Sequence, residues 1–291
     1  MHCDREEAVL FSEIGRTALR DSVCAICPDG SQYRVLMGPR AGQSFLFAEG
    51  NSLKGPLVVT VHTLLNNTTE DRIYLADARS GVLQPLPKAS GQQVLGALSP
   101  DGSHVAYESE IDLKTPPRLA VTDVKTGETT LVPPKDGEFY QAPVWSPDGK
   151  ELMFVSLRRG QGSVPILTSL MRVPFPLDNV VTVFGPEELI GSSAYAPDGK
   201  RFAIWSINGL EVVDWSTLKR TVVFATRSLG SRKPGTAGLI WGRRSDTLAF
   251  TLFNPETSAS ELWVVHETGR DAHLIFRSQD STLYVGSFVD E

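Results

Sequence analysis

The sequence has few cysteines, no excess of basic residues and no long apolar run. Three cysteines among 291 residues do not make a disulfide framework, so we expect packing alone to hold the fold together. The 28 basic and 34 acidic side chains give a net charge of −6, which provides no positive field for nucleic acid. No apolar stretch approaches the roughly 20 residues that span a bilayer, and the chain start lacks the pattern of a signal peptide. The sequence therefore argues against a nucleic-acid partner and a transmembrane segment.

The cysteines do not suggest a metal or redox site. Cys24 and Cys27 form a C-x-x-C pair, but they lie in an apolar stretch where strand alternation sends residues three apart to opposite faces. No second Cys or His pair stands at metal-ligand spacing, so we interpret the stretch as an ordinary strand. Cys3 leaves one alternative open. If Met1 and His2 are not native, a mature lipoprotein would begin at this cysteine, although no lipobox precedes it.

Turn-forming residues, in contrast, are abundant. The chain contains 25 Gly and 19 Pro, more than a helical protein tolerates. Hydrophobic residues make up 41% of the chain, which suffices for a sizeable core. This balance predicts many short strands.

An internal repeat centred on a Ser-Pro-Asp-Gly turn decides the fold. Three segments align without gaps, at 97–107, 144–154 and 194–204, and a fourth at 240–250 keeps the apolar positions but loses Pro-Asp-Gly. The turn residues Asp101, Asp148 and Asp198 are 47 and 50 residues apart, a period that matches one four-stranded propeller blade. Pro fixes φ, Asp bonds the following backbone and Gly accepts a positive φ. The motif therefore predicts the hairpin between the first and second strands of each blade.

Counting by these turns predicts an all-β chain, a six-bladed β-propeller of four-stranded antiparallel blades in a single domain, residues 1–291. A second turn of Asp/Thr/Gly type joins the third and fourth strands. Residues 4–14 also suit a short helix, but we favour a strand there. Five blades fall at about 42–87, 88–134, 135–185, 186–229 and 230–279, and the remaining blade combines 8–37 with the C-terminal strand 282–288. Pairing the C-terminal strand with the N-terminal blade closes the ring and removes exposed sheet edges.

The segment Val144-Trp145-Ser146-Pro147-Asp148-Gly149-Lys150 and its repeats resemble the WD-repeat-like blades of TolB-like propellers. The resemblance covers most of the chain and is clearest in blades three to five. It implies a protein or peptide partner and an extracytoplasmic location, periplasmic or as a lipoprotein. Similar blades also occur in propeller caps of prolyl-oligopeptidase-type peptidases and in sensor modules, so the resemblance specifies a fold better than a function.

No pattern in the sequence indicates catalysis, a cofactor or a metal site. The turn aspartates recur once per blade, far apart around the ring, so we assign them to turn formation. The chain has no Gly-x-Ser-x-Gly elbow, no His-Glu-x-x-His and no phosphate-binding Gly loop, and its five histidines are scattered. The five tryptophans fall in or beside predicted strands, where packing between blades explains them better than carbohydrate stacking. We therefore expect no enzyme activity.

The favoured place for recognition is the face of the ring opposite the tight turns. This face carries the connections from second to third strands and from blade to blade, which are long and unevenly charged. The candidate partner-binding residues are the acidic Glu108, Glu110 and Asp112 and the basic Arg158, Arg159, Arg227 and Arg232.

These observations predict a non-enzymatic, monomeric binding or scaffold propeller that takes a protein or peptide segment on this bipolar face. One alternative is that the charged residues belong to ordinary solvated loops. Another is a propeller module associated with an enzyme, either a peptidase cap or a lyase or hydrolase with loop-borne catalytic residues.

Removing the C-terminal strand tests the predicted closure. Deletion of residues 281–291 should cause gross destabilisation, because it leaves the N-terminal blade without its first strand and opens the ring. Thermal denaturation followed by circular dichroism measures the effect. An unchanged melting temperature would refute closure by this strand.

Overall fold

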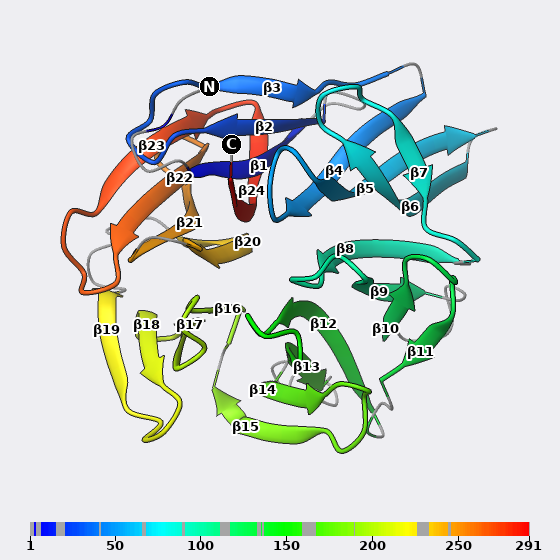
Figure 1. Cartoon of the computed structure of the whole chain (residues 1–291). Helices are drawn as coiled ribbons and strands as arrows, with labels where there is room; N and C mark the ends of the chain where they lie inside the picture. The colour runs from blue at the N-terminus through cyan, green and yellow to red at the C-terminus, as the bar shows by residue number, and fades with distance from the viewer. Residues whose placement is uncertain are drawn as a thin grey trace.

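Six four-stranded antiparallel sheets stand in a ring (Figure 1). We call the axis of the ring, which the first strands of the sheets surround, the channel. The computed structural model describes residues 3, 7–15, 21–40, 42–65, 68–88, 91–110, 117–132, 135, 137–158, 167–188, 190–225, 233–243 and 246–290. Each sheet is one blade, with its first strand next to the channel and its fourth strand at the outer edge. The predicted six-bladed β-propeller is therefore confirmed.

The first three blades occupy the N-terminal half of the chain and its last strand. From the channel outward, the first blade consists of β24 (Ser281–Asp290), β1 (Glu7–Gly15), β2 (Ser22–Ile26) and β3 (Arg34–Met37). The second consists of β4 (Gln43–Gly50), β5 (Pro56–Leu65), β6 (Thr68–Asp77) and β7 (Leu83–Pro85). The third consists of β8 (Gln92–Leu98), β9 (His104–Glu110), β10 (Arg118–Asp123) and β11 (Thr129–Leu131).

The other three blades follow in chain order around the ring. The fourth consists of β12 (Glu138–Trp145), β13 (Glu151–Arg158), β14 (Leu167–Pro174) and β15 (Val181–Glu188). The fifth consists of β16 (Ser192–Tyr195), β17 (Arg201–Ser206), β18 (Gly209–Asp214) and β19 (Arg220–Ala225). The sixth consists of β20 (Lys233–Trp241), β21 (Thr247–Asn254), β22 (Ala259–His266) and β23 (His273–Ser278).

The core lies between blades, because both faces of each sheet are covered. In the third blade, Leu98 and Val105 pack toward the second blade, whereas the adjacent Ala97 and Ala106 pack toward the fourth. Successive side chains of a strand point to opposite faces, so the middle strands contain uninterrupted buried runs. At about 25 cal/mol per Å² of apolar surface, these seams supply the main stabilisation of the ring.

Several strands next to the channel contain a bulge, and buried side chains bind the amides that these bulges release. The register of β12 shifts between Gln141 and Val144, and Ala142 there has a φ of +52°. The Ala142 amide donates to Oε1 of Glu108 in the third blade, at 3.0 Å. Such bonds tie a bulge to the neighbouring blade, since an unpaired buried amide is costly.

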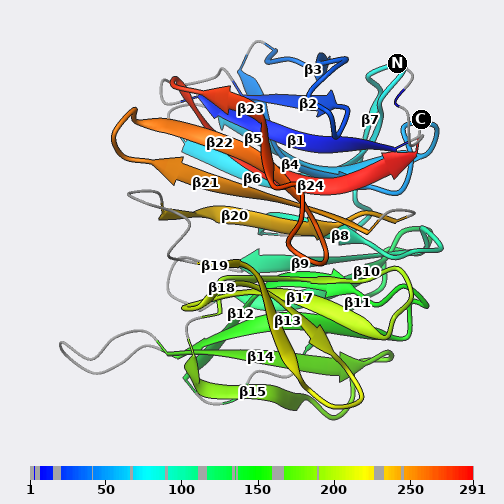
Figure 2. The ribbon, with the colours of Figure 1, turned by 90° about the vertical axis from the view of Figure 1, so that its left-hand side faces the viewer.

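The C-terminal strand closes the ring as the sequence predicts. β24 pairs with β1 from Glu7 opposite Asp290 to Gly15 opposite Ser281, so residues 7–15 form a strand rather than a helix. The tail also reaches the second blade, where the Leu53 amide donates to the Asp290 carbonyl at 2.8 Å and the Asp290 amide donates to the Asn51 carbonyl at 3.3 Å. The start of β1 and the end of β24 lie on the same side of the ring (Figure 2). We call this side, which carries the Ser-Pro-Asp-Gly hairpins, the turn face, and the opposite side the loop face.

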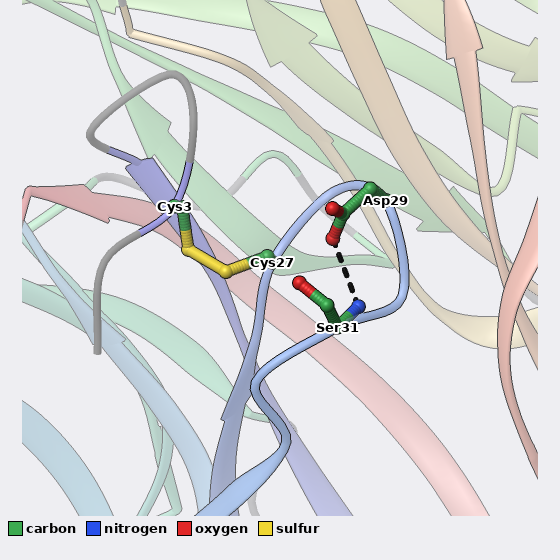
Figure 3. The surroundings of a disulfide bond; sticks show 4 residues. All are labelled: Cys3, Cys27, Asp29 and Ser31. Atoms are coloured by element: carbon green, nitrogen blue, oxygen red, sulfur yellow. Dashed lines mark hydrogen bonds between the residues drawn. A yellow bond between two sulfur atoms is a disulfide. The ribbon is translucent and has the colours of Figure 1, made fainter.

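The expectation that packing alone holds the fold is wrong. Cys3 and Cys27 form a disulfide with a Cα–Cα distance of 5.5 Å, and both residues are buried (Figure 3). The bond ties the N-terminal end to the Pro28-Asp29-Gly30 turn, in which Asp29 Oδ1 accepts the Ser31 amide at 2.8 Å. Sequence reasoning missed the pair because Cys3 lies outside every strand of the repeat. A thioether-linked lipid on Cys3 is incompatible with this bond.

Gly286 tests how closely the closing strand must approach its neighbour. Gly286 is the unpaired residue of a bulge in β24, and a Cβ built there would lie 2.9 Å from the carbonyl carbon of Ala48 and closer still to its oxygen. Gly286→Ala should therefore lower the free energy of unfolding by about 2 to 4 kcal/mol. Gly191→Ala is the matched control, because a Cβ there meets nothing within 4 Å. Urea denaturation measures both variants, and equal stabilities would contradict the close approach.

The thiol content tests the disulfide. Cys24 is buried, and this burial raises the pKa of its thiol to about 12, so iodoacetamide should not modify the native protein. After denaturation without reductant, mass spectrometry should show one alkylated cysteine; three would contradict the disulfide. Cys27→Ser should lower stability by about 3 to 4 kcal/mol, as expected for the release of a loop of this length. Cys24→Ser, which leaves the bond intact, is its control.

Candidate functional site

A hollow lies at the turn-face end of the channel, where the strands next to the channel end. Its cavity volume is about 330 Å³. All six blades contribute to its wall, since it contains residues from the ends of β4, β8, β12, β16, β20 and β24. We call this hollow the channel mouth.

The regular copies of the repeat build the rim of the channel mouth. Pro100, Pro147 and Pro197, the prolines of the three repeats, all line it. The serine of the motif fixes each turn: Ser146 Oγ donates to Asp148 Oδ1 at 2.7 Å and accepts the Glu151 amide at 3.1 Å. Ser99 makes the same two bonds in the third blade. These bonds also hold the pKa values of the turn aspartates low, that of Asp101 to about 2, so the turn carboxylates are ionised structural acceptors.

Aromatic side chains form much of the wall. Trp145, Tyr195 and Trp241 occupy equivalent positions at the ends of their strands, and their exposed fractions are only 7%, 8% and 6%. The Trp145 indole is fixed by a 3.1 Å hydrogen bond from Nε1 to the Ala97 carbonyl of the preceding blade. Their packing between blades is confirmed, and the small remainder of each ring faces the channel mouth. Gly50 takes the equivalent place in the second blade, where a Cβ would lie 2.5 Å from Cδ2 of Leu57, so no side chain projects from this position.

Three polar side chains lie beside these aromatic rings in the wall. Asn51 Nδ2 donates to the carbonyls of Ser99 and Pro100 at 3.3 and 3.4 Å, which leaves Asn51 Oδ1 to accept a hydrogen bond from Nη1 of the exposed Arg243. Glu49 is half-buried in the channel wall. Burial raises the pKa of its carboxyl to about 8, against the opposing effects of the Arg243 charge and a hydrogen bond from the Leu98 backbone. At neutral pH, Glu49 is therefore mostly uncharged and Arg243 carries the charge of the channel mouth.

A groove of about 580 Å³ continues from the channel mouth toward the rim, between the turns of blades four and five. Pro147, Tyr195 and Pro197 line both hollows. In the groove, Tyr195 Oη donates to Glu151 Oε1 at 2.9 Å, and Glu151 Oε2 lies 3.5 Å from Nη1 of Arg172. Burial, followed by the Glu151 charge, raises the pKa of Tyr195, so its hydroxyl remains a donor. The two hollows together form a path from the channel centre to the outer surface.

The structure places three of the predicted partner-binding residues. Arg158 is exposed at the end of β13, opposite Glu138 of β12. Glu110 is the last residue of β9. Glu108 is buried and binds the bulge amide of the fourth blade, so it supports the seam between blades instead of presenting a surface charge. Asp112, Arg159, Arg227 and Arg232 lie outside the described residues, and the loop-face hypothesis stays a prediction.

Histidines and acidic residues are dispersed in the part of the chain that the structure describes. His62 Nδ1 lies 2.6 Å from Asp71 Oδ1, and His104 and His266 each lie 3.8 Å from an aspartate of their own blade. No group of three or more His, Cys, Asp or Glu side chains among the described residues is arranged to hold a metal ion. The same residues include no helix long and apolar enough to cross a membrane.

Sequence reasoning missed Glu49, Asn51 and Arg243 because they belong to the irregular copies of the repeat. Arg243 follows Gly242 at the position where the regular copies carry proline, in the fourth aligned segment that loses Pro-Asp-Gly. Glu49 and Asn51 flank Gly50 in the second blade, which has no Ser-Pro-Asp-Gly turn. The departures from the repeat were visible in the sequence, but their meeting at one point required the closed ring.

Comparison with known proteins supports the fold. No known protein family and no curated protein matches the sequence. Among solved structures, TolB from Acinetobacter baumannii superimposes with a TM-score of 0.75 at 14% identity, over 99% of this chain and 68% of that one. An oligogalacturonate lyase in complex with manganese gives 0.60 at 13%, over 95% and 75%. A puromycin-hydrolyzing peptidase of Mycobacterium tuberculosis gives 0.60 at 17%, over 92% and 45%. The chain thus has the fold of the TolB-like six-bladed β-propellers.

Proposed function

We propose that this protein is a binding propeller that recognises an extended segment of a protein or peptide partner at the channel mouth. The observation that carries the proposal is the aromatic hollow with three convergent polar groups, which is the usual composition of a ligand site. Its volume of about 330 Å³ is near the lower end of the roughly 300 to 1,000 Å³ typical of such sites. The channel mouth therefore suits one or two side chains of a partner, with the adjoining groove taking the segment that follows.

The disulfide supports an extracytoplasmic location for this function. Buried disulfides persist in oxidising compartments and are rare in the cytosol. The resemblance to TolB-like propellers implies the same location. We therefore propose that the partner is also extracytoplasmic and that the propeller acts on it by binding, without a reaction of its own.

The loop face remains the competing surface. Sequence reasoning favours it because of the charge separation between Glu110 and Asp112 on one side and Arg158 and Arg159 on the other. The channel mouth differs in being concave, built from rigid strand ends and lined by polar and apolar surface in similar amounts, features that favour specific recognition. The two surfaces lie on opposite faces, so variants of one leave the other intact.

Selection from a random peptide phage library against the immobilised protein tests the proposal. Selected peptides should bind the Pro147→Trp variant at least tenfold more weakly than the unmodified protein, because the indole fills the boundary between the channel mouth and the groove. Fluorescence anisotropy of labelled peptides measures these affinities. They should bind Arg158→Glu/Arg159→Glu as they bind the unmodified protein. The reverse pattern would assign recognition to the loop face and overturn the proposal. Melting temperatures confirm that both variants are folded.

A further inference from the structure

We propose that the channel mouth is a carboxylate receptor, in which Arg243 pairs with a carboxylate carried by an otherwise apolar group of the ligand. This inference rests on the proposed function and names the chemistry that the same site selects. The ligand carboxylate would come from an acidic side chain or from a chain terminus.

Arg243 is held in place for such a role. One N–H of its guanidinium donates to Asn51 Oδ1, and Asn51 is itself fixed through two carbonyls of the third blade and one amide of the closing strand. The side chain is exposed, so its other N–H groups can reach a ligand. A planar guanidinium matches the two oxygens of a carboxylate, and fixing its orientation reduces the entropy lost on binding.

The charges around Arg243 favour an anion. Glu49 and Arg243 are the charged residues among those described that line the channel mouth. Burial raises the pKa of the Glu49 carboxyl to about 8, so at neutral pH Glu49 does not neutralise the guanidinium. The groups acting on Glu49 are Arg243, from the end of the sixth blade's first strand, and the Leu98 backbone of the third blade. A ligand carboxylate beside the exposed guanidinium remains partly hydrated. Its ionised form therefore loses less hydration free energy than ionised Glu49 would.

The protonated Glu49 adds a donor to the site. A neutral carboxyl has one O–H, which can donate to an incoming carboxylate, whereas an ionised Glu49 would repel it and pair with Arg243 instead. The exposed edges of Trp145, Tyr195 and Trp241 face the channel mouth and would contact the apolar body of the ligand. The ligand class is thus an aromatic or aliphatic group that ends in a carboxylate.

Small probes test the inference on the full chain. In NMR titrations at pH 6.5, 3-phenylpropionate should bind at least tenfold more tightly than 3-phenylpropanamide, which has the same body without the charge. Arg243→Gln should remove this preference, and Arg158→Gln, an exposed arginine on the other face, should retain it. Equal binding of acid and amide, or a preference that survives Arg243→Gln, would overturn the inference.

The pH dependence supplies a second readout with a defined sign. Between pH 7 and pH 9 the affinity for 3-phenylpropionate should fall about tenfold, because Glu49 loses its proton across that range. Glu49→Gln should bind with little change over the same range. An affinity that rises with pH in the unmodified protein would contradict the assignment.

Peptide probes distinguish the source of the carboxylate and separate the two proposals. Acetyl-Phe-Leu with a free C-terminus competes with 3-phenylpropionate if the site takes chain ends, and acetyl-Phe-Glu-amide competes if it takes side chains. Phage-selected peptides that bind at the channel mouth without any carboxylate would overturn this inference and leave the proposed function standing. Both proposals would be overturned if no small probe binds and if Pro147→Trp does not weaken the binding of any selected peptide.

Discussion

The antiparallel pairing of β24 with β1 is the contact on which the rest of the ring depends. Alternate side chains of β24 serve both neighbouring seams, since Phe288 packs with the sixth blade and Val289 packs with the second. The strand thus supplies the first blade with its position next to the channel and joins three blades at once. The first two strands of that blade come from opposite ends of the chain, so no hairpin joins them. The disulfide from Cys3 to Cys27 holds the segment that precedes β1 in place. Two different devices, hydrogen-bonded register and a covalent bond, therefore secure the same place.

The channel mouth arises where this closed ring departs from its own repeat. Regular copies contribute prolines and aromatic rings, which set the shape of the hollow. Irregular copies contribute Glu49, Asn51 and Arg243, which set its polarity. Asn51 lies at the centre of this arrangement, because its backbone carbonyl binds the closing strand while its side chain orients Arg243. The residues that close the ring and those that would select a ligand are consequently in direct contact.

The sequence predicts the architecture because the turn chemistry recurs at a fixed period. Pro-Asp-Gly locates three hairpins, and the apolar rhythm extends the count to all six blades and to the tail. The disulfide escapes this reasoning, since Cys3 belongs to no repeat and its distance from Cys27 is set only when the first blade forms. Sequence reasoning places Glu108 at the start of a long charged connection, whereas the residue lies within β9 and accepts a bulge amide that no sequence pattern reveals. The channel mouth was missed because its polar residues come from blades that are distant in sequence.

The last described residues of the chain lie beside the channel mouth. Ser287 and Phe288 line the channel mouth, and Asp290 binds the backbone beside Asn51, so the C-terminal end of the chain emerges at the rim of the hollow. The N-terminal end is fastened on the same face. A segment joined to the C-terminal end by a short flexible linker would therefore be held near the channel mouth at millimolar effective concentration. A tethered segment would then occupy the channel mouth even with a weak intrinsic affinity, and a free ligand would have to displace it.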